Sequence, residues 1–201
     1  MRTLFSGLLI SFSGVVLTNC AIRVTEDPNM PFTRADSLTD SFLAYQDSML
    51  LSWNIMINDD NQKIKAMHNL LHELLITSEN ERDQLTKYEE QLDQLVRLRY
   101  TQKSMGNSDV IEEYDFATTT LVRELISLAE SRSEFAYNGT LQELVENIRM
   151  ADERVNNYRE EYDVIVMKYN RFLERNKPLL QEISHSDSLE RKYLFRMVSA
   201  E

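Results

Sequence analysis

Glycine and proline are scarce in this chain of 201 residues, which has only four glycines and three prolines. The prolines are Pro28, Pro31 and Pro178, so none interrupts the sequence between Phe32 and Lys177. β-Sandwiches and α/β folds need glycine and proline at their many turns. Their scarcity excludes those classes and predicts an all-α protein, with a sizeable core because 42% of the residues are hydrophobic.

Cysteine and net positive charge are also lacking. Cys20 is the only cysteine, so no disulfide can form within the chain. The formal net charge is −11, which repels phosphate backbones and argues against nucleic acid as a partner. The sequence has no Gly-x-Ser-x-Gly motif and too few glycines for a phosphate-binding loop. We therefore expect no enzymatic activity, no catalytic residue and no cofactor.

The N-terminal segment has the pattern of a bacterial secretion signal. Arg2 precedes an apolar stretch over residues 4–17, which is shorter than the roughly 20 residues that span a bilayer. The sequence Leu-Thr-Asn-Cys that ends at Cys20 resembles the lipobox of bacterial lipoproteins. The resemblance implies cleavage between Asn19 and Cys20, and attachment of lipid, such as palmitate, to the cysteine.

These patterns predict four regions along the chain. They are a signal peptide (1–19), a lipidated cysteine with a flexible tether (20–36), a helical bundle (37–180) and a C-terminal segment (181–201). Lipid on Cys20 would hold the protein on a membrane of the cell envelope. Ala21 follows the cysteine, and the absence of aspartate there favours the outer membrane, facing the periplasm, with the inner membrane as the alternative.

Apolar residues recur at helical spacing in four segments after the tether. The predicted helices cover roughly residues 37–77, 78–102, 109–133 and 140–177. Three of the predicted starts are capping boxes, at Ser78 with Glu81, Asp109 with Glu112 and Thr140 with Glu143. The last helix has the clearest stripe, at the spacings of three and four residues that are typical of coiled-coil packing: Leu141, Leu144, Ile148, Ala151, Val155, Tyr158, Tyr162, Ile165, Tyr169 and Phe172.

A polar stretch, Asn58–Gln62, interrupts the apolar stripe of the first long helix and puts Asn61 at a stripe position. Two interpretations stay open. The stretch is either a buried polar layer that fixes the register of the helices or a solvated kink.

Short connections between successive helices favour antiparallel neighbours. We therefore expect an up-and-down antiparallel four-helix bundle with long helices. The rival arrangement is a long hairpin in which helices merge at Thr77 and Gly139, and it ranks second because it buries less apolar surface. A short capped helix is expected from Asp187 to Val198 in the C-terminal segment.

Six residues of the last predicted helix form a motif, namely Arg159, Tyr162, Asp163, Val166, Tyr169 and Asn170. Their spacing resembles the LemA family pattern Arg-x-x-Tyr-Asn-x-x-Val-x-x-Tyr-Asn, with Asp163 at the first asparagine position. Shorter matches, such as Trp53 followed by Lys63 and Asn69–Leu71, extend the resemblance over about residues 40–180.

The LemA resemblance implies a membrane-attached helical bundle outside the cytoplasm, without established catalytic residues. Many family members use an N-terminal transmembrane helix, and lipid on Cys20 would take its place here. The spacing of the motif puts its tyrosines on or beside the helix seam, where tyrosines bury their rings. Core packing is thus the favoured role of the motif, and a ligand site is the alternative.

Two histidines, His68 and His72, lie one helical turn apart and could chelate a metal ion. No third ligand lies beside them in the sequence. Glu182 and His185 form one copy of a motif that di-iron bundles need twice. We therefore expect no metal site.

The sequence as a whole predicts a membrane-anchored, non-enzymatic interaction or scaffold module of the cell envelope, of the LemA type. It does not identify the protein partners. The alternative is a binding protein that holds a small or lipid-like ligand between its helices. A cavity lined by Tyr158, Tyr162 and Tyr169 would support that alternative.

Overall fold

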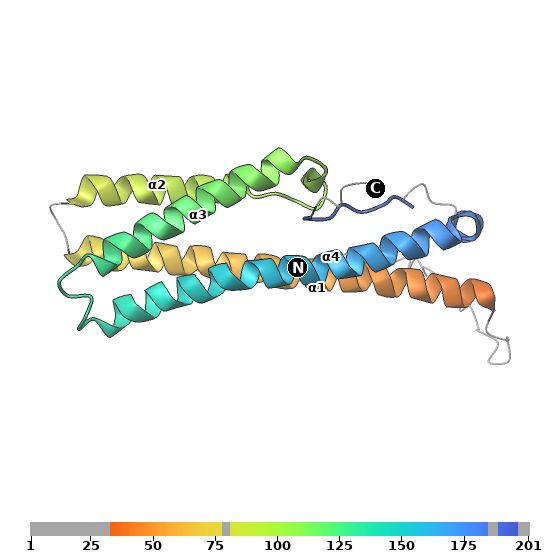
Figure 1. The fold of residues 1–201 in the computed structure, drawn as a ribbon, viewed down its shortest axis with the longest axis horizontal. Helices are drawn as coiled ribbons and strands as arrows, with labels where there is room; N and C mark the ends of the chain where they lie inside the picture. The colour runs from red at the N-terminus through yellow and green to blue at the C-terminus, as the bar shows by residue number, and fades with distance from the viewer. Residues whose placement is uncertain (1–32, 78–80, 185–188, 197–201) are drawn as a thin grey trace, which may run out of the picture. The chain divides into compact units, whose positions relative to one another are not determined.

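A computed structural model of the chain describes residues 33–77, 81–184 and 189–196 (Figure 1). The described residues form four α-helices and one short 3-10 turn: α1 (Arg34–Thr77), α2 (Arg82–Leu98), η2 (Ser104–Gly106), α3 (Ser108–Glu130) and α4 (Gly139–Ser184). They contain no strand, so the all-α prediction is confirmed for this part of the chain. None of these helices is long and apolar enough to cross a membrane. The predicted signal peptide and Cys20 lie outside the described residues.

The two longest helices, α1 and α4, share the most extensive contact of any two helices (Figure 1). The predicted apolar stripes of both helices are confirmed, because every apolar residue in them is at least partly buried. On α1 these residues are Phe42, Tyr45, Met49, Trp53, Ile57, Ile64, Met67, Leu71 and Leu74. Aromatic rings mark the seam, with ring centroids 5.2 Å apart for Tyr45 and Phe172 and 5.6 Å apart for Trp53 and Tyr162. The seam therefore forms as the 3-4 spacing predicts.

Helices α2 and α3 pack against each other and against α1. Apolar residues at helical spacing also predict a stripe on each of these helices. Leu85 and Leu92 of the α2 stripe and Leu125 of the α3 stripe are fully buried, whereas Val96 of the α2 stripe is 51% exposed. The long-hairpin alternative is wrong, because α1 and α2 are separate helices in contact and turns at residues 131–137 separate α3 from α4.

Asparagines begin two of the helices in place of the predicted capping boxes. Asn107 Oδ1 accepts a hydrogen bond from the amide of Asp109 at 3.0 Å. Asn138 Oδ1 accepts hydrogen bonds from the amides of Thr140 and Leu141, both at 3.1 Å. The caps predicted at Asp109 and Thr140 are therefore wrong, because an asparagine just before each helix already satisfies its first amides.

The polar stretch of α1 stays helical and puts charge into the interior. Asp59 and Asp60 are each 8% exposed and Lys63 is 3% exposed, whereas Asn61 faces solvent. The polar-layer interpretation thus holds for residues beside Asn61 and fails for Asn61 itself.

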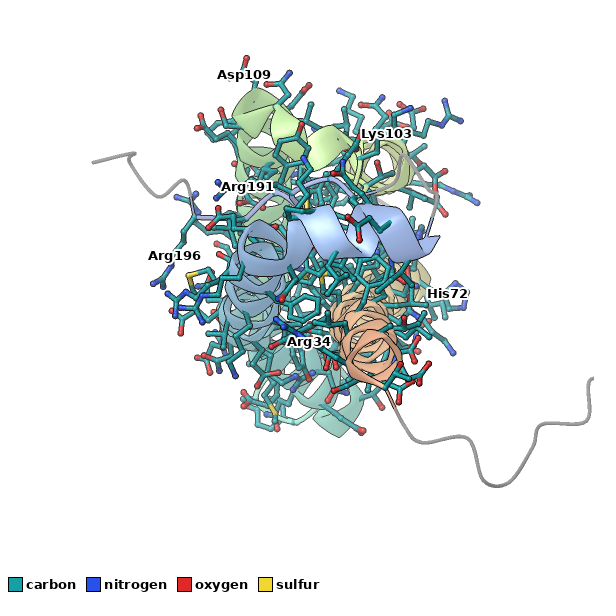
Figure 2. The ribbon with its side chains drawn as sticks, turned by 90° about the vertical axis from the view of Figure 1, so that its right-hand side faces the viewer. Arg34, His72, Lys103, Asp109, Arg191 and Arg196 are labelled. Carbon is teal, nitrogen blue, oxygen red and sulfur yellow. The ribbon has the colours of Figure 1, made fainter. Side chains whose placement is uncertain are left out.

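The sequence predicts that the last helix ends at Lys177. This prediction is wrong, because α4 continues through Pro178 to Ser184. Leu180 is 2% exposed, so burial of this turn stabilises the continued helix. Proline lacks an amide and commonly kinks a helix. Figure 2 shows the last turns of α4 running in a different direction from the rest of the helix.

Residues 189–196, which we call the tail, form neither helix nor strand. The short helix predicted from Asp187 to Val198 is therefore wrong across the tail, and its two ends lie outside the described residues. The physical reason is that side chains of α4 bind the main chain of the tail, as described below.

Candidate functional site

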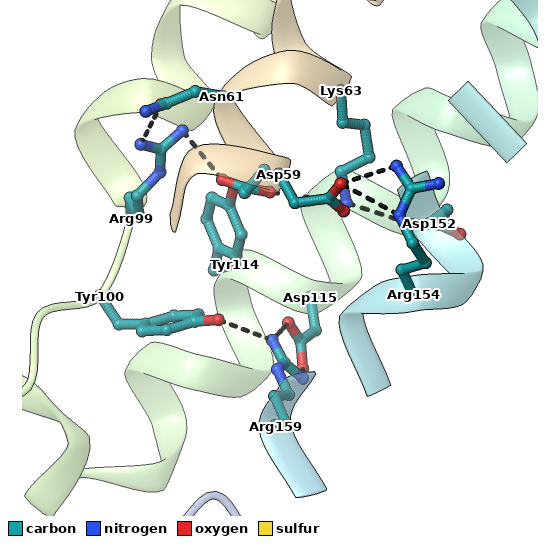
Figure 3. Close-up of polar contacts among 11 residues, drawn as sticks. Asp59, Asn61, Lys63, Arg99, Tyr100, Tyr114, Asp115, Asp152, Arg154 and Arg159 are labelled. Carbon is teal, nitrogen blue, oxygen red and sulfur yellow. Dashed lines mark hydrogen bonds and ion pairs between the residues drawn. The ribbon is translucent and has the colours of Figure 1, made fainter. Parts of the chain in front are cut away.

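Charged and hydroxyl side chains gather where α1, α3, α4 and the end of α2 meet (Figure 3). We call this group the central cluster. Its members are Asp59, Asp60, Lys63, Arg99, Tyr100, Tyr114, Asp115, Asp152, Arg154 and Arg159.

Asp60 is the most heavily bonded carboxylate of the central cluster. Its Oδ2 accepts a hydrogen bond from the Tyr114 hydroxyl at 2.6 Å and lies 2.8 Å from Arg99 Nη2. Lys63 Nζ lies 3.6 Å from the other oxygen of Asp60 and 3.2 Å from Asp152 Oδ1. Burial raises the pKa of Tyr114, and the Asp60 charge raises it further, so the phenol stays protonated.

A second ion pair of the cluster joins α1 to α4 directly. Asp59 Oδ1 accepts hydrogen bonds from Nε and Nη2 of Arg154 at 3.0 and 2.6 Å. The hydrogen bonds to Asp59 raise the pKa of Arg154. The side chain of Arg154 is 36% exposed, so water competes for this pair more than for the pairs of Asp60.

Arg159 connects the central cluster with the tail. Two of its nitrogens donate to Asp115 at 2.7 and 2.6 Å, and Nη2 also donates to the Tyr100 hydroxyl at 3.0 Å. Its guanidinium carbon lies 4.9 Å from the ring centroid of Phe195, a cation–π arrangement. Burial alone would lower the pKa of Arg159, but the hydrogen bonds and charges of Asp115 and Tyr100 together outweigh burial and raise the pKa, so the cation persists.

Two motif residues of α4 bind the main chain of the tail. Asp163 Oδ1 accepts a hydrogen bond from the amide of Phe195 at 2.8 Å, and Oδ2 accepts one from the amide of Arg196 at 3.0 Å. Asn170 accepts from the amide of Lys192 and donates to the carbonyl of Lys192, both at 2.9 Å. These contacts use the main-chain groups that a helix would have paired internally, which explains why the tail is not helical.

The tyrosines of the motif complete the contact with the tail. The Tyr169 hydroxyl donates to the carbonyl of Glu190 at 3.3 Å. The Tyr162 ring lies 5.7 Å from the ring of Phe195. Burial, with a further contribution from the Asp163 charge, raises the pKa of Tyr162 to about 12. Val166 is fully buried in the core.

All six motif residues thus lie on α4, and five of them contact the tail through hydrogen bonds or rings. The sequence placed the motif tyrosines on or beside the helix seam but did not indicate the tail as a common partner. Asn170, for example, bonds to the main chain of Lys192. The apolar pair Leu194-Phe195 was the one available signal of a docked tail.

The other candidate residues lie apart from this site. His68 Nε2 is 3.8 Å from Asp93 Oδ1, and His72 is exposed (Figure 2). Within the described ranges, no group of three or more His, Cys, Asp or Glu side chains is arranged to hold a metal ion. Tyr162 lines a hollow of about 160 Å³ beside Met49, whereas Tyr169 is fully buried. Asn19, Cys20 and His185 lie outside the described residues.

Comparison with known proteins gives no identification, since no family model, no curated protein and no solved structure matches the chain. The fold and the site therefore define only a structural class. The chain is an all-α protein with a charged cluster between its helices and a helix that binds an extended tail.

Proposed function

We propose that this protein is a non-enzymatic, lipid-anchored interaction module of the cell envelope, of the LemA type. The observation that carries the proposal is the way α4 binds the tail. Side chains of the motif hold an extended segment by its main chain and enclose one aromatic side chain. Recognition of extended peptides by protein-interaction modules uses the same two kinds of contact.

The proposal includes the up-and-down antiparallel arrangement of the helices. Contacts between α1 and α4 support it, because residue numbers rise along α1 as they fall along α4. The contacting pairs are Phe42 with Tyr169, Trp53 with Tyr162 and Lys63 with Asp152. Short connections between successive helices are typical of up-and-down bundles.

The pairing in the central cluster supports a structural role over catalysis. Asp60 is bonded to Arg99 and Tyr114, and Asp115 to Arg159. A catalytic acid or base must instead face the group whose proton it transfers. The charges of the cluster hold the helices together and are not directed at a substrate.

A ligand-binding role is the second candidate, because one hollow lies among charged side chains of α1, α3 and α4. It measures about 140 Å³ and is lined by Lys63, Thr118 and Arg159. Thr118 Oγ1 is buried there without a hydrogen-bond partner. This lining suits a small polar molecule and not an acyl chain. Denaturing mass spectrometry of protein taken from native membranes would contradict this candidate if no small molecule were released.

The lipid anchor can be tested at Cys20. We expect the wild-type chain to incorporate radioactive palmitate, because the lipobox-like sequence places a cysteine at the acylated position. We expect it to fractionate with the outer membrane, because Ala21 and not aspartate follows the cysteine. A Cys20→Ser chain should not incorporate label. Labelling of that variant, or no labelling of the wild type, would remove the anchor from the proposal.

The interaction role can be tested with a photoreactive amino acid at Met167, which is 42% exposed and lines a hollow beside the tail. We expect a reproducible protein adduct in native membranes. The control position is Phe116 on α3, which is 76% exposed. Absence of any specific adduct at both positions would count against an interaction module.

A further inference from the structure

Side chains of α4 and of neighbouring segments form the site in which the tail lies. We call it the α4 groove, and its residues are Arg159, Tyr162, Asp163, Tyr169 and Asn170, with Trp53 and Tyr100 beside them. Its hydrogen bonds reach amides and carbonyls of the tail, which every extended peptide carries. These bonds supply affinity and leave the choice of sequence to side-chain contacts.

Phe195 is the main side chain that the groove selects. Its ring stacks on Trp53, with centroids 6.3 Å apart and an interplanar angle of 11°, and it meets Tyr100 edge-on at 5.5 Å. The guanidinium of Arg159 lies over the Phe195 ring, 4.9 Å from its centroid, and over the Tyr100 ring at 5.5 Å. A phenylalanine at this position of a peptide would gain ring–ring and cation–π contacts together.

Tyr193 makes a second selective contact. A Cβ atom at Gly106 would lie 2.8 Å from the Tyr193 ring, so glycine leaves the space that this ring occupies. The connection between α2 and α3 thus takes part in holding the tail.

Charge also matches the tail to the groove. The tail has three basic residues and one acidic residue, whereas the whole chain has a net charge of −11. Arg191 Nη1 lies 2.8 Å from Glu174 Oε1, and Arg196 pairs with Glu160, both on α4. The groove therefore favours a basic occupant.

Several side chains of the tail remain exposed to solvent. Arg191, Tyr193 and Arg196 are 70%, 56% and 73% exposed. A hollow of about 190 Å³ lies between Leu194 and Met167. Of the tail residues only Leu189 is fully buried, while Leu194 and Phe195 pack partly buried against the core. Because these contacts involve only a short segment, release of the tail costs less than opening the seam between α1 and α4.

We propose that the α4 groove is an exchangeable peptide-binding site, filled by its own tail in one chain and by the tail of a second copy when copies assemble. The same contacts form within a chain and between chains, so local concentration decides which occupant is present. This inference rests on the proposed interaction role, but it does not depend on the lipid anchor.

Peptide binding tests the groove itself. A fluorescent peptide of the tail sequence (residues 189–196) is titrated into full chains, and anisotropy is measured. A Phe195→Ala chain should bind the peptide at least about tenfold more tightly than wild type, because its own tail no longer occupies the groove. An Arg191→Glu/Arg196→Glu chain should do the same without leaving a cavity, because both ion pairs with α4 are lost. Phe116→Ala, at an exposed position of α3, is the matched control and should behave as wild type.

The groove residues are tested in the same assay. Adding Asp163→Asn and Asn170→Ala to the Phe195→Ala chain removes acceptors for tail amides and should abolish the gain in affinity. Equal binding to wild type and to both tail variants, with unchanged circular dichroism, would overturn the proposal. Retained binding after loss of Asp163 and Asn170 would overturn it as well.

Exchange between copies is tested by mixing two full chains. One is ¹⁵N-labelled Phe195→Ala, with an open groove, and the other is unlabelled Asp163→Asn/Asn170→Ala, with a free tail. We expect cross-links that join an unlabelled tail peptide to a labelled α4 peptide. Mixtures of labelled and unlabelled copies of a single variant give the background. Cross-links at background level would overturn exchange between copies. The interaction role is tested independently by the adducts at Met167 in native membranes.

Discussion

Arg159 illustrates how one motif side chain serves two parts of the molecule. Its guanidinium is bidentate to Asp115 on α3 and lies over the Phe195 ring of the tail. A planar, permanently charged group can make both contacts at once, which a lysine cannot. The arginine of the motif therefore links the central cluster to the α4 groove.

An Arg159→Lys substitution should lower the free energy of unfolding by about 2 kcal/mol, because a side chain that is only 14% exposed loses its paired hydrogen bonds to Asp115 and its ring contact. Urea denaturation followed by circular dichroism measures the loss. The control is Arg149→Lys, whose pair with Glu130 is 45% and 40% exposed, and it should cost less than about 0.5 kcal/mol. Equal effects of the two substitutions would contradict the role of Arg159.

Tyr162 makes the free energy of unfolding depend on pH in the alkaline range. Its pKa is about 12 in the folded chain against an ordinary value of 10.0. The unfolded chain releases this proton first, so the contribution of Tyr162 is complete below pH 10 and is lost as the pH rises towards 12. A Tyr162→Phe chain has no phenol at this position and does not lose this stability. Between pH 10 and pH 12 its free energy of unfolding should therefore rise by about 2 kcal/mol relative to that of wild type. Urea denaturation at both pH values measures the change, and parallel curves would contradict it.

At the scale of elements, asparagines and prolines set where the helices begin and bend. Asn107 and Asn138 accept hydrogen bonds from the first amides of α3 and α4. Pro178 lies inside α4, which continues because Leu180 beyond it is buried. Local sequence signals therefore mark the ends of elements correctly only where packing agrees with them.

The cap of α4 gives a direct test at this scale. Asn138→Ala should cost about 1 kcal/mol of stability, because two amides lose their acceptor. Thr140→Ala should cost less than about 0.5 kcal/mol, since the Thr140 side chain is not the cap. Thermal and urea unfolding measure both values. The reverse order would show that the Thr140 capping box operates after all.

At the scale of the described molecule, the central cluster joins all four helices. Asp60 on α1 is bonded to Arg99 after α2 and to Tyr114 on α3, while Lys63 on α1 reaches Asp152 on α4. Buried charges of this kind specify how helices align, because any other register would leave them unpaired.

Two neighbouring aspartates test this alignment role. Asp60→Asn should cost about 3 kcal/mol, because the buried cations around it lose their shared partner. Asp59→Asn should cost about 1 kcal/mol, because Arg154 is 36% exposed and water replaces the lost carboxylate charge. Chemical denaturation of both variants measures these losses of stability. Similar losses for the two variants would contradict a special role of Asp60.

The sequence by itself determined the helical class and the stripes of α1 and α4, because burial at 3-4 spacing is a local property of the chain. It also placed the motif tyrosines on or beside the helix seam, and both Tyr162 and Tyr169 are buried. Only the tertiary structure decided what the motif residues bind. Asp163 and Asn170 meet a tail more than 20 residues further along the chain, and no local period encodes such a contact. The same holds for Asp60, whose partners lie 39 and 54 residues away, at Arg99 and Tyr114. Packing of distant segments brings these charges together, and their burial then requires that they pair.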